Sequence, residues 1–208
     1  ENSAPNTVMI LTPSNGDSYC VGQPIPFDGW ATDQETGNLT YYADEAFRWS
    51  YGDDTFIGSG NPLSRELPTG AHTITLTVSD GSASVNESVN ITVRDPSAGP
   101  CPPTVSIRRP DNTQVVGIGT SDCLLLQVDE AYDIIDGELT GDTSVWEDQI
   151  YGVVKREFTG REVDVCEFDA LDVDTPHTIR VTATNSRGES RSASRTIYVT
   201  PIERTISC

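Results

Sequence analysis

Histidines and cysteines are the residues best suited to chemistry, and their spacing argues against a catalytic or redox site. His72 and His177 are the only histidines among 208 residues. The five cysteines are far apart in the chain: Cys20, Cys101, Cys123, Cys166 and Cys208. They include no CxxC pair, which zinc and thiol-redox sites usually show. Since no nucleophile elbow, HExxH or phosphate-binding loop is present either, we expect no enzyme activity.

Acidic side chains are the other residues that could bind a ligand. Asp and Glu number 32 against 13 Lys and Arg, so the net charge is -19. Such a chain repels phosphate backbones, which excludes nucleic acid as a partner. No apolar run approaches the roughly 18 residues of a membrane-spanning helix, so no membrane span is predicted. Carboxylates are ligands that hard cations such as Ca²⁺ prefer, and cation binding therefore remains open.

Two copies of one sequence pattern organise the chain. Segment 31–39 (ATDQETGNL) matches segment 131–139 (AYDIIDGEL). Further matches in the same order are Trp49 with Trp146, His72 with His177, and 91–93 with 197–199. Catalytic pairs rarely arise as equivalent positions of two copies, so the histidines are interpreted as structural.

A Pro- and Gly-rich segment separates the two copies. Its sequence, RDPSAGPCPP at 94–103, cannot continue a strand. We therefore predict a first domain over residues 1–95, a linker over 96–103 and a second, more divergent domain over 104–208.

Alternating apolar and polar residues predict β-strands in both copies. Ile74, Leu76 and Val78 alternate with threonines, as expected for half-buried strands. Short strands in units of about 100 residues indicate two tandem immunoglobulin-like antiparallel β-sandwiches. In such a fold Trp49 and Trp146 are the core tryptophans of the third strand.

The first copy resembles the PKD and related Ig-like modules of bacterial secreted proteins. The resemblance is carried by WSYGDD at 49–54 and TLTVSDG at 75–81. It implies repeated extracellular spacer or adhesion modules attached to larger surface proteins or secreted hydrolases. The second copy lacks the Gly-Asp turn after its tryptophan, so its membership depends on the repeat alignment.

The resemblance also implies a calcium site in the first domain. In PKD-like modules that bind calcium, oxygen ligands come from the N-terminal entry, the loop after the second strand and the loop before the last strand. These places hold Asn2, Ser3, Asp33, Glu35 and Asp80.

A turn-capping role is the alternative for Asp33 and Glu35, in a tight turn closed by Gly37. In the second copy Ile135 and Asn185 replace Glu35 and Asp80. We therefore expect a weak calcium site there or none.

The cysteine spacing is typical of disulfides in an oxidising compartment. From the expected strand directions, Cys20 pairs with Cys101 and Cys123 with Cys208, and Cys166 stays unpaired. The alternative joins Cys123 to Cys166. It is disfavoured because Cys166 is expected at the top of a descending strand and Cys123 at the bottom of an ascending one, beyond the roughly 7 Å Cα separation of a disulfide.

The leading functional hypothesis is a non-catalytic, extracellular structural or adhesion module of the cell surface: a spacer, a stalk or a subunit of a surface assembly. Its partners would be other surface-protein domains or subunits, and exposed edge strands could support a homo-polymer. The alternative is a polysaccharide-binding accessory module of a secreted enzyme, which needs exposed aromatic side chains. The candidates for that role are Tyr41, Tyr42, Tyr51 and Phe56.

Overall fold

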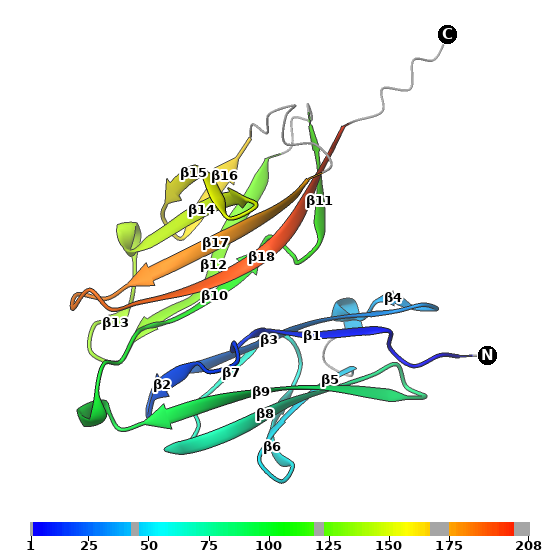
Figure 1. Ribbon diagram of the computed structural model, residues 1–208, viewed down its shortest axis with the longest axis horizontal. Coiled ribbons are helices and arrows are strands. Elements are labelled where there is room, and N and C mark those ends of the chain that lie inside the picture. The colour runs from blue at the N-terminus through cyan, green and yellow to red at the C-terminus, as the bar shows by residue number, and fades with distance from the viewer. Residues whose placement is uncertain (1, 43–45, 119–122, 167–174, 202–208) are drawn as a thin grey trace. The chain divides into compact units, whose positions relative to one another are not determined.

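The computed structural model describes residues 2–42, 46–118, 123–166 and 175–201. The chain divides into two compact units, Glu1–Thr104 with Tyr132–Gly137, and Val105–Ala131 with Glu138–Cys208. Each sequence copy forms one β-sandwich made of a four-stranded and a five-stranded sheet (Figure 1).

The first sandwich follows the alternation of apolar residues. Its strands are β1 (Thr7–Thr12), β2 (Ser18–Cys20), β3 (Ile25–Asp33), β4 (Gly37–Asn38), β5 (Phe47–Tyr51), β6 (Thr55–Ser59), β7 (Leu63–Arg65), β8 (Gly70–Ser79) and β9 (Ser84–Arg94), with the 3₁₀ turns η1 (Leu39–Tyr42) and η2 (Pro96–Ala98). One sheet has the order β1-β3-β4, with β7 also paired to β3, and the other has the order β2-β9-β8-β5-β6. Strand β2 runs parallel to β9, whereas the other pairs are antiparallel.

The second sandwich repeats this strand order. It contains β10 (Thr104–Arg109), β11 (Gln114–Ile118), β12 (Leu124–Asp133), β13 (Gly137–Glu138), β14 (Ser144–Ile150), β15 (Val153–Thr159), β16 (Glu162–Val165), β17 (Pro176–Thr184) and β18 (Ser190–Pro201), with the turn η3 (Gly141–Thr143). Its sheets are β10-β12-β13, with β16 paired to β12, and β11-β18-β17-β14-β15. The prediction of two tandem Ig-like β-sandwiches is therefore confirmed.

Each sandwich closes around the tryptophan expected in its core. Trp49 and Trp146 are fully buried. Their indole N–H groups donate to the carbonyls of Gly60 at 3.1 Å and Gly160 at 2.9 Å. A buried indole needs such a partner, because an unsatisfied N–H in an apolar core is costly. Both sandwiches thus satisfy the indole N–H of the core tryptophan with a glycine carbonyl.

Gly29 lets the two sheets of the first sandwich approach closely. A Cβ at this position of β3 would lie 2.6 Å from the Leu76 side chain and 3.2 Å from the Phe47 ring. Both neighbours are fully buried, so they have little room to move. The position therefore requires glycine for packing, a requirement that the strand pattern alone did not reveal.

Candidate functional site

The N-terminal segment of the first sandwich joins two loops that are far apart in the sequence. The Asn2 amide donates from Nδ2 to Asp80 Oδ2 at 3.0 Å. The Ser3 hydroxyl donates to Glu35 Oε2 at 2.8 Å. The structure thus places the expected entry segment beside the loop after β3 and the loop after β8. Four of the five residues proposed for calcium therefore form two separate hydrogen-bonded pairs.

The fifth, Asp33, organises the turn between β3 and β4. Its Oδ1 accepts hydrogen bonds from the backbone N–H groups of Glu35 at 3.0 Å and Thr36 at 2.7 Å. Gly37 closes the turn with a φ of 80°, a conformation that glycine adopts without strain. Asp33 therefore does cap the turn, as the alternative interpretation holds.

Turn capping uses only one of the two carboxylate oxygens of Asp33. The side chain is 3% exposed, and its Oδ2 has no hydrogen-bond partner among the residues that the structure describes. A buried carboxylate oxygen without a partner is costly. Turn capping therefore leaves one buried oxygen of Asp33 without a hydrogen-bond partner in the described part of the structure.

Asp80 is held as a carboxylate by the loop that follows β8. Its Oδ1 accepts from the N–H groups of Ser82 at 2.7 Å and Ala83 at 2.8 Å. The hydrogen bond from the Ala83 N–H, followed by that from Ser82, lowers the pKa of the Asp80 carboxyl, because both favour the charged form. Asp80 is thus an anionic oxygen donor at neutral pH.

The donor set suits a hard cation in type, but the carboxylates are not gathered as closely as in a formed metal cage. Carboxylate, amide and hydroxyl oxygens are the groups that Ca²⁺ binds. In the described ranges, however, no three or more His, Cys, Asp or Glu side chains form a group that could hold a metal ion. Asp80 and Glu35 instead accept hydrogen bonds from the side chains of Asn2 and Ser3.

The second copy retains both turns without two of the carboxylates. Asp133 Oδ1 accepts from the N–H groups of Ile135 at 2.9 Å and Asp136 at 3.0 Å, as Asp33 does in the first copy. Asn185 Oδ1 accepts from the N–H groups of Arg187 at 3.0 Å and Glu189 at 2.9 Å. Turn formation therefore does not require a carboxylate at the position of Glu35 or Asp80.

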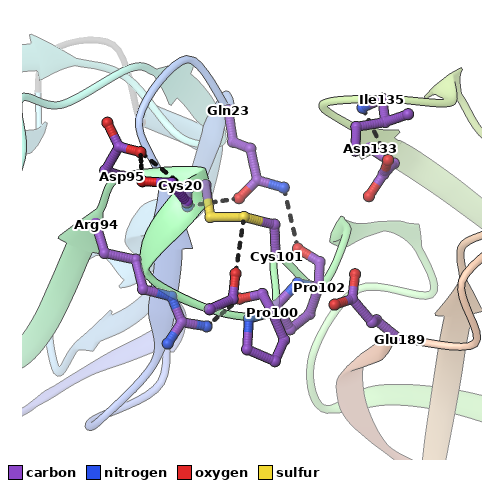
Figure 2. Close-up of a disulfide and its surroundings, with 12 residues drawn as sticks. Cys20, Gln23, Arg94, Asp95, Pro100, Cys101, Pro102, Asp133, Ile135 and Glu189 are labelled. Atoms are coloured by element: carbon purple, nitrogen blue, oxygen red, sulfur yellow. Dashed lines mark hydrogen bonds between the residues drawn. A yellow bond between two sulfur atoms is a disulfide. The ribbon is translucent and has the colours of Figure 1, made fainter.

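The first disulfide joins Cys20 to Cys101, the pair that the strand directions predicted. The two Cα atoms are 5.8 Å apart, and both residues are buried. Gln23 accepts from the Cys20 N–H at 2.7 Å and donates to the Pro102 carbonyl at 3.0 Å (Figure 2). The disulfide thus holds the segment after β9 against the turn after β2.

The second disulfide corrects the sequence-based pairing. Cys123 is bonded to Cys166, with their Cα atoms 4.0 Å apart, and not to Cys208, which lies outside the described residues. The error came from placing the two cysteines at opposite ends of the sandwich. In fact β16 runs antiparallel to β12 with Val165 opposite Leu124, so the next residues in each direction are the two cysteines.

The histidines occupy equivalent positions but have different partners. His72 Nε2 lies 2.6 Å from the Pro68 carbonyl, and the ring meets Tyr51 edge-on at 5.0 Å between centroids. His177 is fully buried, and its Nδ1 lies 2.7 Å from Asp148 Oδ1. Sequence reasoning missed the Asp148 partner, although an acid between the inward-facing Trp146 and Ile150 was a signal for it.

The aromatic residues proposed for polysaccharide binding do not share one surface where their side chains are described. Tyr51 packs against the core of the first sandwich. Phe56 is 57% exposed, with the Arg48 guanidinium 5.3 Å from its ring centroid. Tyr41 and Tyr42 lie in η1, and their side chains lie outside the described part of the structure.

Comparisons with known proteins found similar solved structures but no family. No protein-family model matches the chain, and no curated protein matches its sequence. Among solved structures, the fibronectin(III)-like modules of Clostridium thermocellum CbhA are 18% identical, with 97% of this chain and 100% of that chain covered and a TM-score of 0.36. The Ig1-2 module of the Drosophila receptor protein tyrosine phosphatase DLAR is 11% identical (94% and 100% covered, TM-score 0.35).

A third similar structure is dimeric latent PorU from Porphyromonas gingivalis, at 13% identity and a TM-score of 0.49. The match covers 97% of this chain and 21% of the PorU chain. Because these TM-scores are at most 0.49, the fold assignment depends on the strand order of the chain and not on these structures. Within the described residues, no helix has the length and apolar character needed to cross a membrane.

Proposed function

We propose that the chain is a non-catalytic structural module of the cell exterior, a spacer or stalk within a surface protein or surface assembly. In the described residues, the side chains that could do chemistry serve the fold. Four cysteines form two disulfides, and both histidines contact a carbonyl or a carboxylate. Its partners would be neighbouring domains or subunits of the same surface structure.

The disulfides support the extracellular part of the proposal. Each closes a long loop, with sequence separations of 81 and 43 residues. Such crosslinks persist in oxidising compartments and are rare in reducing ones. We therefore expect the protein isolated from its own source to carry both disulfides.

We further propose that calcium braces the first sandwich at the loops after β3 and β8. The observation that carries this proposal is the buried, unpartnered Oδ2 of Asp33. Asp33, Glu35 and Asp80 would supply carboxylate oxygens, and Asn2 and Ser3 would supply neutral ones. The cation would neutralise repulsion between the acids and tie the N-terminal segment to both loops.

A melting experiment on the full chain tests the calcium brace. Calcium sites of extracellular modules have dissociation constants of about 10⁻⁴ to 10⁻³ M, so 10 mM calcium should stabilise the first sandwich by about 1.4 to 2.7 kcal/mol. For a domain of this size the melting temperature should rise by roughly 6 to 20 °C. Magnesium at the same concentration controls for ionic strength.

Two matched variants make the test specific. Asp33→Asn keeps the capping oxygen and the side-chain shape but removes the charge, so it should abolish the calcium-dependent rise. Asp133→Asn makes the same change at the equivalent turn of the second copy and should leave the rise intact. An identical melting curve with and without calcium in the unmodified chain would leave Asp33 as a turn cap alone.

A further inference from the structure

The outer face of the five-stranded sheet in the second sandwich carries an exposed apolar row. Val115 on β11 lies opposite Tyr198 on β18, and Tyr198 lies opposite Pro176 on β17. Tyr151 follows Ile150, which lies opposite His177, the neighbour of Pro176. These four residues, Val115, Tyr198, Pro176 and Tyr151, make up a row across the adjacent strands β11, β18 and β17 and the turn after β14. We call it the apolar row.

Strand alternation places Val115, Tyr198 and Pro176 on the outside of the sandwich. Ile197 and Val199, on either side of Tyr198, are fully buried, so Tyr198 faces outward. Exposure is 62% for Val115, 41% for Tyr198 and 85% for Tyr151, which lies at the tip of the hairpin between β14 and β15. Exposed apolar residues that are contiguous, unlike scattered ones, mark a binding surface.

The fold does not require apolar residues at these positions. In the first sandwich Thr92 on β9 and Ala71 on β8 are opposite each other, as Tyr198 and Pro176 are in the second. Ser18 pairs with Thr92 as Val115 pairs with Tyr198. The same sheet position is therefore stable with small or polar side chains, and the apolar row is a property of the second copy alone.

The charge of this sheet differs from that of the whole chain. Its strands carry five basic residues and three acidic ones, whereas the chain has a net charge of -19. On the outer face Arg180 lies 3.7 Å from Glu147, so these two charges offset each other. The four residues of the apolar row are themselves uncharged, so this part of the surface suits an uncharged ligand.

Polar side chains accompany the row on the same face. Gln149, Thr178 and Thr196 lie opposite one another on β14, β17 and β18, one outward position away from the row. An aromatic ring that covers a sugar face, beside amide and hydroxyl groups that bond its rim, is the usual composition of a carbohydrate site. The row and these three residues provide both parts.

Strand spacing defines the shape of the ligand. Tyr198 and Tyr151 are separated by one intervening strand, so their backbones lie about 10 Å apart at about 4.8 Å per strand. This distance is close to two pyranose units of an extended chain. We infer that the apolar row binds a neutral, extended, β-linked polysaccharide, with Tyr151 and Tyr198 each covering a sugar ring.

Retention of the full chain on insoluble polymers tests this inference. Microcrystalline cellulose, chitin and insoluble xylan are the extended β-linked probes, and granular starch is the helical α-linked control. At least one extended polymer should retain the chain at physiological salt, and starch should not. Tyr151→Ala and Tyr198→Ala should each weaken binding by roughly 3- to 10-fold.

Control variants separate this surface from the rest of the chain. Phe56→Ala removes the exposed aromatic of the first sandwich, and Thr92→Ala changes the position equivalent to Tyr198; both should bind like the unmodified chain. Melting curves should confirm that Tyr151→Ala still folds, since that side chain is 85% exposed.

Two results would overturn the inference. One is the absence of retention on all three extended polymers. The other is concentration-dependent self-association in sedimentation that Tyr151→Ala abolishes, because a second copy would then cover the row. Neither result depends on calcium, so the proposal of a calcium brace stands or falls separately.

Discussion

Breaking the Cys123–Cys166 disulfide should destabilise the second sandwich by a predictable amount. Both cysteines are exposed, so the Cys123→Ser/Cys166→Ser double variant removes the crosslink and little buried surface. The sequence separation is 43 residues. In the chain-entropy model, a loop of that length gives about 4 kcal/mol of stability.

Urea unfolding, followed by tryptophan fluorescence, measures this loss in the transition of the second sandwich, which exposes the buried Trp146. With a slope of about 1 to 2 kcal/mol/M for a domain of this size, the unfolding midpoint should fall by roughly 2 to 4 M. Cys208→Ser is the matched control, because the sequence-based alternative paired Cys123 with Cys208. A midpoint that falls in Cys208→Ser, and is unchanged when Cys166 is replaced, would refute the observed pairing.

Three further predictions concern packing and charge in the two sandwiches. Gly29→Ala should destabilise the first sandwich by about 1 to 3 kcal/mol, because the new Cβ meets Leu76 at 2.6 Å; an unchanged urea midpoint would contradict this packing. Asp148→Ala should cost the second sandwich about 3 kcal/mol, because it leaves the buried His177 without its carboxylate partner, and thermal melting would reveal a smaller loss if the pair were dispensable. The lowered pKa of Asp80 means that its contribution to stability is fully present above about pH 4 and is lost as the pH falls further. In urea titrations between pH 2 and 7, Asp80→Asn should therefore differ from the unmodified chain at neutral pH and converge with it in acid.

The sequence was sufficient for the architecture because the information is local and repeated. Alternation around Ile74 and Leu76 predicted strands, and the equivalence of Trp49 and Trp146 predicted two cores. The resemblance to PKD-like modules also implied that the N-terminal segment lies near the loop of Asp80. These inferences need only the topology of the fold, which the repeat revealed.

Features that depend on register were beyond the sequence. Cys166 bonds to Cys123 because the short strand β16 pairs with β12, and nothing in its four residues indicates which sheet it joins. The apolar row is similar, since Tyr151 and Tyr198 come to lie one strand apart only when β14, β17 and β18 are aligned. Gly29 was missed for the same reason, because its constraint comes from side chains on two other strands.

Direct calcium titration of the metal-free chain tests the central claim, that the first sandwich is a structural module braced by a cation. Isothermal titration calorimetry counts the sites and needs no unfolding. One saturable site per chain is expected, absent from Asp33→Asn and retained by Asp133→Asn. No saturable binding up to 10 mM calcium, or binding that is unaffected by Asp33→Asn, would contradict it.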